Sequence, residues 1–147
     1  MVLRSSLRFA KLSFADQAAT IEALAAVAAA RALLSTVNQG TLGRILRPII
    51  SEAVRPDGGG DVVGLTVAID RIRHAIRRAS TRVPGATCLV QALGGWWMFK
   101  ARGIPAQVRI GVDKNDLGFS AHAWLVIGET VVLGGADSAA RFVVLRA

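Results

Sequence analysis

The sequence predicts an α+β fold, with helices in the first half of the chain and a small antiparallel sheet in the second. Residues 1–82 are rich in alanine, leucine and arginine, and their apolar residues recur at helical intervals. Residues 83–147 hold one further helix, followed by short segments of alternating apolar and polar side chains that are separated by glycines. A length of 147 residues fits a single domain, so we expect both halves to share one core.

The first helix is expected to begin after Ser13 and to run to about residue 34. Ser13 followed by Asp16 resembles a capping box, with Asp in place of the usual Glu. The alanine-rich stretch that follows carries Arg31, and no segment of the chain reaches the roughly 18 consecutive apolar residues of a membrane span. We therefore expect no membrane span, no signal peptide and a cytoplasmic location, which also suits a free thiol.

Two further helices are expected before residue 82. Residues 41–54 form the second, which should bend or break near Pro48 because proline lacks the backbone donor that a helix interior needs. The third should begin after Asp61 as its cap and end near Ser80, with Ile72 and Ile76 on its apolar side.

Cys88 is the only cysteine in the chain, and it lies where a fourth helix should begin. Thr87 is a good N-cap for that helix, and Gly103 followed by Pro105 should end it. A thiol at a helix start meets unpaired backbone N–H groups and the positive end of the helix dipole. Both stabilise the thiolate, which is the nucleophilic form of cysteine.

The strands come after this helix. Residues 113–118 read as a loop, and Gly128-Glu129 reads as a two-residue turn. Strand alternation puts His122 and Trp124 on the same face. The expected strands are 106–112, 119–127, 130–133 and, at the end of the chain, 141–145.

The formal charge is +8, and 12 of the 18 basic residues lie in residues 1–82. The densest group is Arg71, Arg73, Arg77, Arg78 and Arg82. Two interpretations stay open: a solvated helix face, or a surface for an acidic protein or peptide. Nucleic acid is not expected as a partner, since there is no tyrosine and no aromatic residue lies among the arginines.

The chain has one cysteine and two histidines, and they are not spaced as metal ligands usually are. Neither a metal nor another cofactor is therefore expected.

Cys88 and His122 have a plain structural interpretation when each is taken alone. Free cysteine is commonly a small buried core residue, and a lone histidine on a strand is more often structural than catalytic. Together they are the minimum for a thiol hydrolase, with a nucleophile on a helix start and a base on a strand.

Four segments, in this order and at these spacings, resemble the leader peptidase of lasso-peptide biosynthesis. They are Cys88-Leu89-Val90-Gln91-Ala92-Leu93, Arg102-Gly103-Ile104-Pro105-Ala106, Arg109-Ile110-Gly111-Val112 and Ala121-His122-Ala123-Trp124. The resemblance is specific over residues 83–133 and looser elsewhere. It implies a transglutaminase-like, papain-related fold with the cysteine-bearing helix packed on the sheet.

The resemblance also implies an activity and partners. Members remove the leader from a ribosomally made precursor peptide. A chain of this size looks like the protease-only form, which receives its substrate from a separate leader-binding protein; the lasso cyclase is a further candidate partner. Cys88 would attack the scissile carbonyl, with its own N–H as an oxyanion donor, and His122 would act as base and then acid.

The third catalytic residue departs from the family. The usual Asp, about twelve residues after the histidine, is replaced here by Gly134. If Gly128-Glu129 is a two-residue turn, His122 pairs with Gly135, and Asp137 becomes a diagonal neighbour within about 7–8 Å. Asp137 therefore either completes a triad or caps a following turn.

Two other residues are expected near the predicted site. Trp124 is expected to wall the substrate site. Gln91, one turn after Cys88, either assists at the oxyanion or is an ordinary helix glutamine.

Two rival functions remain beside the peptidase. One is a scaffold with little or no catalysis that holds the maturation proteins together, favoured by the missing Asp. The other is a different amide hydrolase or acyltransferase of the transglutaminase fold.

Overall fold

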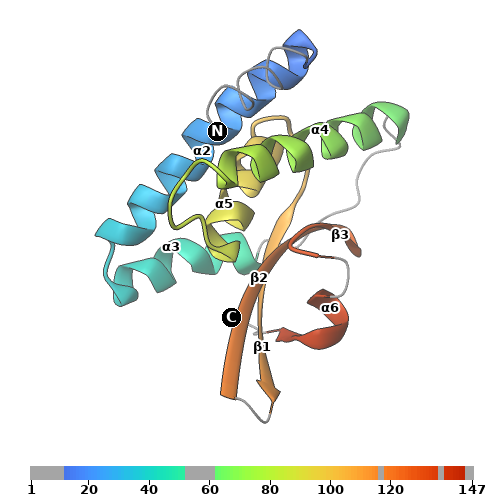
Figure 1. Ribbon diagram of the computed structural model, residues 1–147. Helices are drawn as coiled ribbons and strands as arrows, with labels where there is room; N and C mark the ends of the chain where they lie inside the picture. The colour runs from blue at the N-terminus through green and yellow to red at the C-terminus, as the bar shows by residue number, and fades with distance from the viewer. Residues whose placement is uncertain (1–11, 52–61, 116–117, 136–137, 145–147) are drawn as a thin grey trace.

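The structure is a computed structural model that describes residues 12–51, 62–115, 118–135 and 138–144. It confirms the α+β prediction, with helices packed on a four-stranded antiparallel sheet (Figure 1). The helices are α2 (Phe14–Thr36), α3 (Gln39–Ser51), α4 (Val62–Ser80), α5 (Cys88–Lys100) and the short α6 (Ser138–Arg141). The strands are β1 (Gln107–Asn115), β2 (Gly118–Ile127), β3 (Thr130–Leu133) and β4 (Val143–Val144).

Helix α2 begins as its sequence predicts. The Ser13 hydroxyl accepts a hydrogen bond from the Asp16 N–H at 3.2 Å and donates one to the Asp16 carboxylate at 2.7 Å. Arg71 of α4 adds an ion pair to the same carboxylate at 3.0 Å. These hydrogen bonds from Ser13 and Arg71 hold the pKa of Asp16 below its ordinary value. The Asp16 carboxylate therefore holds the capping hydroxyl of Ser13 and ties α2 to α4.

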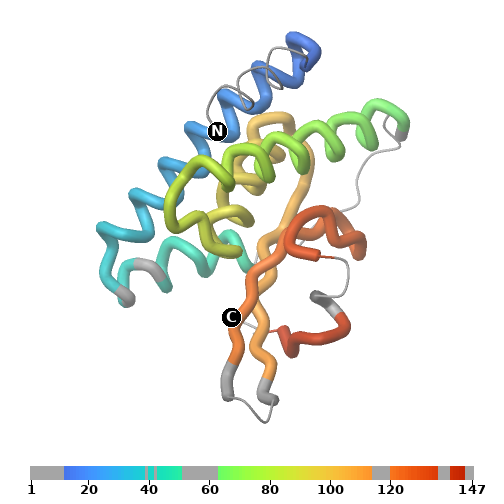
Figure 2. Tube along the Cα trace, in the orientation of Figure 1, coloured from blue at the N-terminus to red at the C-terminus, as the bar shows by residue number. Residues whose placement is uncertain are grey.

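The second predicted helix differs from expectation at its proline. Helix α3 starts at Gln39 and continues through Pro48 to Ser51, so of the expected bend or break the break does not occur. Pro48 lacks the N–H that would bond to the carbonyl four residues earlier, yet the helix continues for three more residues. Figure 2 shows this segment beside the β1–β2 hairpin, and the Gln107 amide donates a hydrogen bond to the Ile50 carbonyl at 2.8 Å. The third helix is confirmed from Val62 to Ser80, while its expected cap, Asp61, lies outside the described residues.

Helix α5 is the central element of the fold. It contacts α2 and α4 as well as the sheet, and its buried residues reach from Val90 to Phe99. Two glycines permit this packing on both sides. A Cβ on Gly94 would lie 3.1 Å from Val27 of α2, and a Cβ on Gly95 would lie 2.4 Å from Leu133 of β3. Because α5 is held from both sides, the position of Cys88 at its start is fixed relative to the sheet.

The sheet has the order β3-β2-β1-β4. Residues 113–115 extend β1 and pair with β2, so the loop predicted from residue 113 onward starts later than expected. The two-residue turn at Gly128-Glu129 is confirmed, since Ile127 pairs with Thr130. A register shift between Leu125 and Val126 then pairs Leu125 with Leu133.

Helix α2 is long and apolar enough to cross a membrane by length and composition, with a mean hydropathy of 1.5 over 18 residues. Arg31 interrupts its apolar run, so the helix does not meet the criterion of about 18 consecutive apolar residues. One side of the helix packs against α4 and α5, with Ala19, Ala23, Val27 and Ala30 buried, but only 28% of the apolar window is buried. The absence of a membrane span therefore stays a prediction.

Arg102 links the end of α5 to α2, and this contact gives a stability prediction. Its guanidinium binds both oxygens of Glu22, at 2.8 and 2.6 Å, and also donates to the Met98 carbonyl. The hydrogen bond from Arg102 holds the pKa of Glu22 below its ordinary value of 4.5. A carboxylate with a lowered folded-state pKa contributes stability above that ordinary value, and this stability is lost as the pH falls through the folded-state pKa.

We expect Glu22→Gln to lower the free energy of unfolding by about 0.5–1 kcal/mol at pH 7, the upper range for a partly exposed pair. Below the folded-state pKa the variant and the parent should become equal. Urea unfolding at pH 7 and at pH 3 measures both values. Asp70→Asn is the matched control, because the ion pair that Asp70 forms among the described residues is an exposed one with Arg73 of the same helix. An equal deficit for Glu22→Gln at both pH values would contradict the prediction.

Candidate active site

The start of α5 places Cys88 as the sequence predicts. Thr87 is the N-cap, and its hydroxyl accepts a hydrogen bond from the Val90 N–H at 3.4 Å. The Thr87 carbonyl accepts from the Gln91 N–H at 3.0 Å. Within the described part of the chain, the N–H groups of Cys88 and Leu89 have no acceptor, as expected for a first helical turn. Two backbone donors are thus free beside the half-buried thiol.

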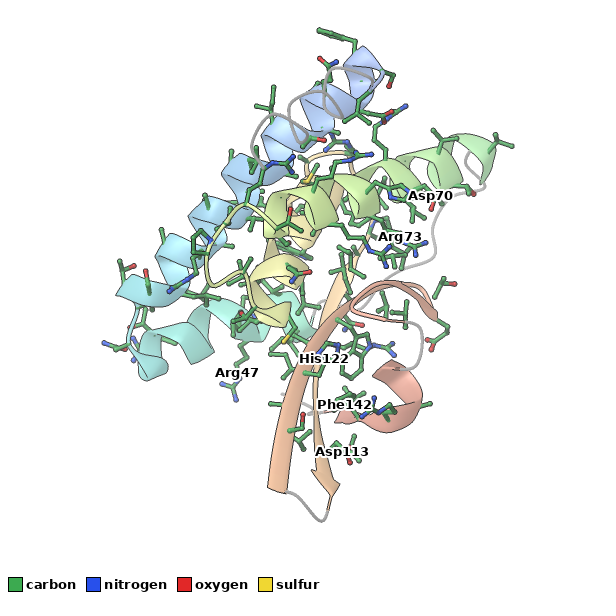
Figure 3. The ribbon with its side chains drawn as sticks, viewed as in Figure 1. Arg47, Asp70, Arg73, Asp113, His122 and Phe142 are labelled. Atoms are coloured by element: carbon green, nitrogen blue, oxygen red, sulfur yellow. The ribbon has the colours of Figure 1, made fainter. Side chains whose placement is uncertain are left out.

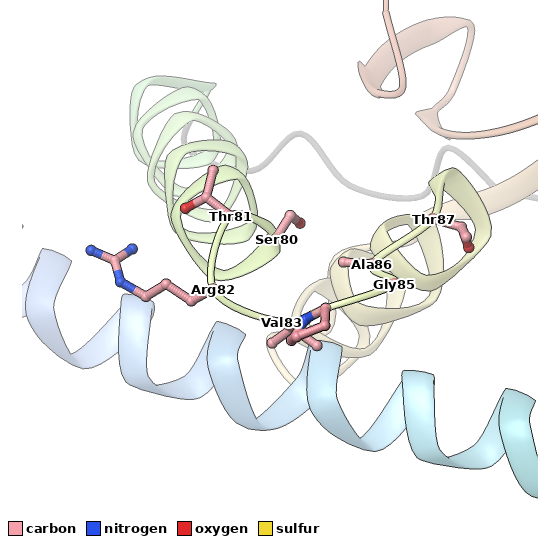
Figure 4. A pocket seen from close by; sticks show the side chains of 8 residues that line it. Ser80, Thr81, Arg82, Val83, Gly85, Ala86 and Thr87 are labelled. Atoms are coloured by element: carbon pink, nitrogen blue, oxygen red, sulfur yellow. The ribbon is translucent and has the colours of Figure 1, made fainter. Parts of the chain in front are cut away.

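The loop that leads into Cys88 is braced by Gln91. The Gln91 side-chain amide donates a hydrogen bond to the Ala86 carbonyl at 2.9 Å, across the turn that precedes the helix. Figure 4 shows this loop passing from α4 to α5 over α2, and residues 80–87 line a hollow of about 460 Å³ there. The contact gives Gln91 a structural task, which is to hold the loop that delivers Cys88. An additional role at the oxyanion stays a prediction.

The imidazole of His122 is oriented by a backbone carbonyl. Its Nε2 lies 2.7 Å from the carbonyl oxygen of Gly134. A carbonyl oxygen only accepts hydrogen bonds, so this contact assigns the proton to Nε2. Nδ1 is then the unprotonated nitrogen, available to take a proton from a thiol.

An aromatic cluster supports the imidazole. The indole of Trp124 stacks with it at 6.1 Å between ring centroids, and the Phe142 ring lies 5.2 Å away (Figure 3). Gly111, the partner of His122 across β1, makes room for this cluster, since a Cβ there would lie 2.8 Å from the Trp124 ring. Trp124 is 0% exposed, so in this structure it packs beneath His122 and presents no surface to a substrate. The role of Trp124 in substrate binding stays a prediction, and the burial of its side chain does not support it.

Cys88 and His122 line the same cleft, which has a volume of about 540 Å³. Its other walls come from α4, the first turn of α5, β2 and residues 131–135. No hydrogen bond joins the Cys88 thiol to the imidazole in the described part of the chain. Catalytic hydrogen bonds are often long without substrate and shorten in the complex. The fold therefore brings the two predicted residues, 34 positions apart in the sequence, to one cleft.

Among the described residues, the group that contacts Nε2 of His122 is not the Asp137 carboxylate that simple strand pairing suggested. Asp137 lies outside the described residues, so its predicted role stays a prediction. The pairing of His122 with Gly135 that led to it is not formed, because the bulge after Leu125 shifts the register and β3 ends at Leu133. The Gly134 carbonyl, 12 residues after His122, reaches Nε2 instead. No charged side chain of the described residues contacts Nε2 of His122.

This arrangement depends on the absence of a side chain at residue 134. Gly134 has φ of +100°, and a Cβ there would lie 2.5 Å from the Trp124 Cβ. An Asp side chain here would clash with Trp124 and displace the carbonyl that holds His122, so Gly134→Asp should disturb the orientation of the imidazole.

We expect Gly134→Ala to lower the free energy of unfolding by about 1–3 kcal/mol, from backbone strain and the clash. Any reaction that depends on the orientation of His122 should slow as well, because the carbonyl must move away from Nε2. Gly128→Ala is the matched control: Gly128 also has positive φ, +58°, but a Cβ there would meet nothing within 4 Å. Thermal unfolding and reaction rates of both variants check this. Equal losses of stability and rate in the two variants would show that the contact with Trp124 is not the reason position 134 requires glycine.

Several residues of the site could not be found from the sequence. Phe142 follows a short helix and gives no periodic signal, and the role of Gly134 lies in its backbone. Arg73 and Arg77 also line the cleft, although the sequence showed them only as part of a larger arginine group. No group of three or more His, Cys, Asp or Glu side chains suited to a metal ion occurs among the described residues.

Comparison with known families gives one match. A family model described as the transglutaminase-like superfamily matches residues 3–147. Comparisons with curated proteins and with solved structures give no match.

Proposed function

The chain belongs to the transglutaminase-like superfamily, and from this membership we propose that it is a cysteine-dependent enzyme acting on amide bonds. The observation that carries the proposal is the cleft shared by Cys88, at the start of α5, and His122, with Nε2 held by Gly134. In this arrangement Nδ1 of His122 is the nitrogen that can accept the proton of the Cys88 thiol. The arrangement supplies a nucleophile, a base and an oxyanion site.

The first half of the reaction forms a thioester. His122 Nδ1 takes the thiol proton, and the Cys88 sulfur attacks the amide carbon with formation of a C–S bond. The negative charge that develops on the carbonyl oxygen is stabilised by the free N–H groups of Cys88 and Leu89 and by the helix dipole. The tetrahedral intermediate then breaks its C–N bond, and the imidazolium gives its proton to the leaving amine.

The second half returns the free enzyme. Water gives a proton to Nδ1 and attacks the thioester carbon, the C–S bond breaks, and the thiolate is reprotonated by the imidazolium. During both halves the imidazolium is stabilised by the Gly134 carbonyl dipole, which is weaker than a full carboxylate charge. We therefore expect a slower enzyme than one with a complete triad.

For the substrate, we propose the leader segment of a ribosomally made lasso-peptide precursor. This rests on the resemblance of residues 83–133 to the leader peptidases, whose superfamily this chain shares. A leader-binding protein would present the precursor, the lasso cyclase would take over the product, and the reaction would proceed in the cytoplasm.

One observation favours the scaffold alternative, namely that no carboxylate contacts His122 among the described residues. A scaffold would bind the precursor and its partners without forming a thioester. An acyltransferase would form the thioester but pass the acyl group to an amine rather than to water. Intact-mass measurement after mixing separates these outcomes, since it detects an acyl-enzyme, a hydrolysed peptide or an amine adduct.

The direct test is a cleavage assay with a lasso-peptide precursor and its leader-binding protein, to be sought among the genes that neighbour this one. We expect cleavage between leader and core when both are present, and little or none without the leader-binding protein. Mass spectrometry of the peptide identifies the bond that is cut. Efficient cleavage without the binding protein would contradict the proposed partner, and no cleavage under either condition would contradict the proposed substrate.

A further inference from the structure

The arginine group of α4 divides into residues with structural partners and residues that face the cleft. Arg71 pairs with Asp16 of α2, and Arg82 donates a hydrogen bond to the Arg78 carbonyl at 2.7 Å. Arg73 and Arg77, one helical turn apart and hence on one side of α4, line the Cys88–His122 cleft. Figure 3 shows Arg73 projecting from α4 on the side of β3.

The charge of these two arginines is not balanced within the cleft. No Asp or Glu lines the cleft among the described residues. Arg73 pairs at 3.4 Å with Asp70, but both side chains of that pair are solvent-exposed, and such pairs are weak. Arg77 is exposed and forms no ion pair with any described residue. The α4 wall of the cleft thus carries two positive charges, one of them only weakly paired and the other without an ion-pair partner among the described residues.

We propose that Arg73 and Arg77 determine specificity by binding a carboxylate of the substrate close to the scissile amide. The proposal rests on the proposed function, since it names a feature of the substrate that the same cleft would accept. Guanidinium groups are suited to it because they bind carboxylates through paired hydrogen bonds. The carboxylate is either an Asp or Glu side chain within the peptide or the carboxyl terminus of the peptide.

The first test uses the thiol itself as the reporter and needs no knowledge of the natural substrate. Iodoacetate and iodoacetamide both alkylate a thiolate with release of iodide, but only iodoacetate carries a carboxylate. The ratio of their rates at Cys88 therefore measures the charge at the nucleophile, independently of thiol reactivity. We expect the double variant Arg73→Gln/Arg77→Gln to lower the iodoacetate-to-iodoacetamide ratio about threefold to tenfold, as expected for one or two charges at close range.

Controls separate this effect from a general change of charge. Arg44→Gln removes one exposed arginine on α3, outside the cleft, and should leave the ratio unchanged. High salt should reduce the difference between parent and double variant, because screening weakens the field of exposed charges. A ratio that is equal in parent, double variant and Arg44→Gln would overturn the proposal.

The same assay distinguishes a failure of this proposal from a failure of the proposed function. Slow alkylation by iodoacetamide, no faster than for a small-molecule thiol, would count against Cys88 as a nucleophile. The reagent ratio would still report whether Arg73 and Arg77 attract a carboxylate. Fast alkylation with an unchanged ratio would retain the enzyme and reject the specificity residues.

A second experiment identifies the source of the carboxylate. Four five-residue alanine-based peptides are tested for protection of Cys88 against iodoacetamide. Two are terminally blocked and carry either Asp or Asn in the centre, and two contain only alanine and end in a free carboxylate or in an amide. Stronger protection by the Asp peptide than by the Asn peptide indicates a side-chain carboxylate, and stronger protection by the free acid indicates the terminus. Either preference should disappear in the double variant; equal protection by all four peptides overturns the proposal.

Discussion

Cys88→Ala is expected to reduce cleavage of the precursor by about 10⁴-fold or more, because removing a nucleophile also removes the covalent route. Cys88→Ser should be nearly as inactive, since a serine hydroxyl at the same place is a much weaker nucleophile without a strong base. The fold should persist in both variants. Cys88 is only half-buried, and the helix cap is provided by Thr87 rather than by the thiol.

The measurement is the initial rate of precursor cleavage, with circular dichroism and thermal unfolding as controls for the fold. A second readout is the intact mass of the parent enzyme during turnover, which should show an acyl group on Cys88. Thr87→Ala is a useful comparison: it should cost about 1 kcal/mol of stability through the lost cap and slow the reaction while leaving the nucleophile in place. Undiminished cleavage by folded Cys88→Ala protein would end the thiol mechanism.

His122→Ala is expected to slow cleavage by at least about 10²-fold, the lower range for general acid–base catalysis. His122 is the base that serves the thiol and the acid that serves the leaving amine, and no second histidine lines the cleft among the described residues. His74→Ala is the matched control. His74 is exposed on α4 and does not line the cleft, so its removal should leave the rate unchanged.

A structural role for His122 would produce a similar loss, so a chemical readout is needed. Added imidazole should partly restore the activity of His122→Ala, since a free base can enter the vacated space, and it should have no effect on Cys88→Ala. Rescue of neither variant, together with a lowered unfolding temperature for His122→Ala, would assign His122 to structure. Loss of activity in His74→Ala with a normal rate in His122→Ala would invert the assignment.

Features that depend on near neighbours could be predicted from the sequence. Ser13 and Thr87 start their helices through hydrogen bonds to residues three positions away, so both starts could be predicted to the residue. The turn at Gly128-Glu129 and the shared face of His122 and Trp124 follow from a two-residue loop and from strand alternation. The order and spacing of the motifs around Cys88 and His122 also pointed to the superfamily that the family comparison establishes.

Features that depend on distant parts of the chain could not be predicted from local sequence and became visible in the three-dimensional fold. The course of α3 through Pro48 and the bulge after Leu125 are set by packing and pairing, which outweigh local preferences. That bulge, with the left-handed backbone at Gly134, brings a carbonyl to His122, and a search for a carboxylate side chain could not find a backbone acceptor. The arginines are alike in sequence. The packing of α4 beside α2, α5 and β3 determines that Arg73 and Arg77 line the cleft of Cys88 while Arg71 binds Asp16.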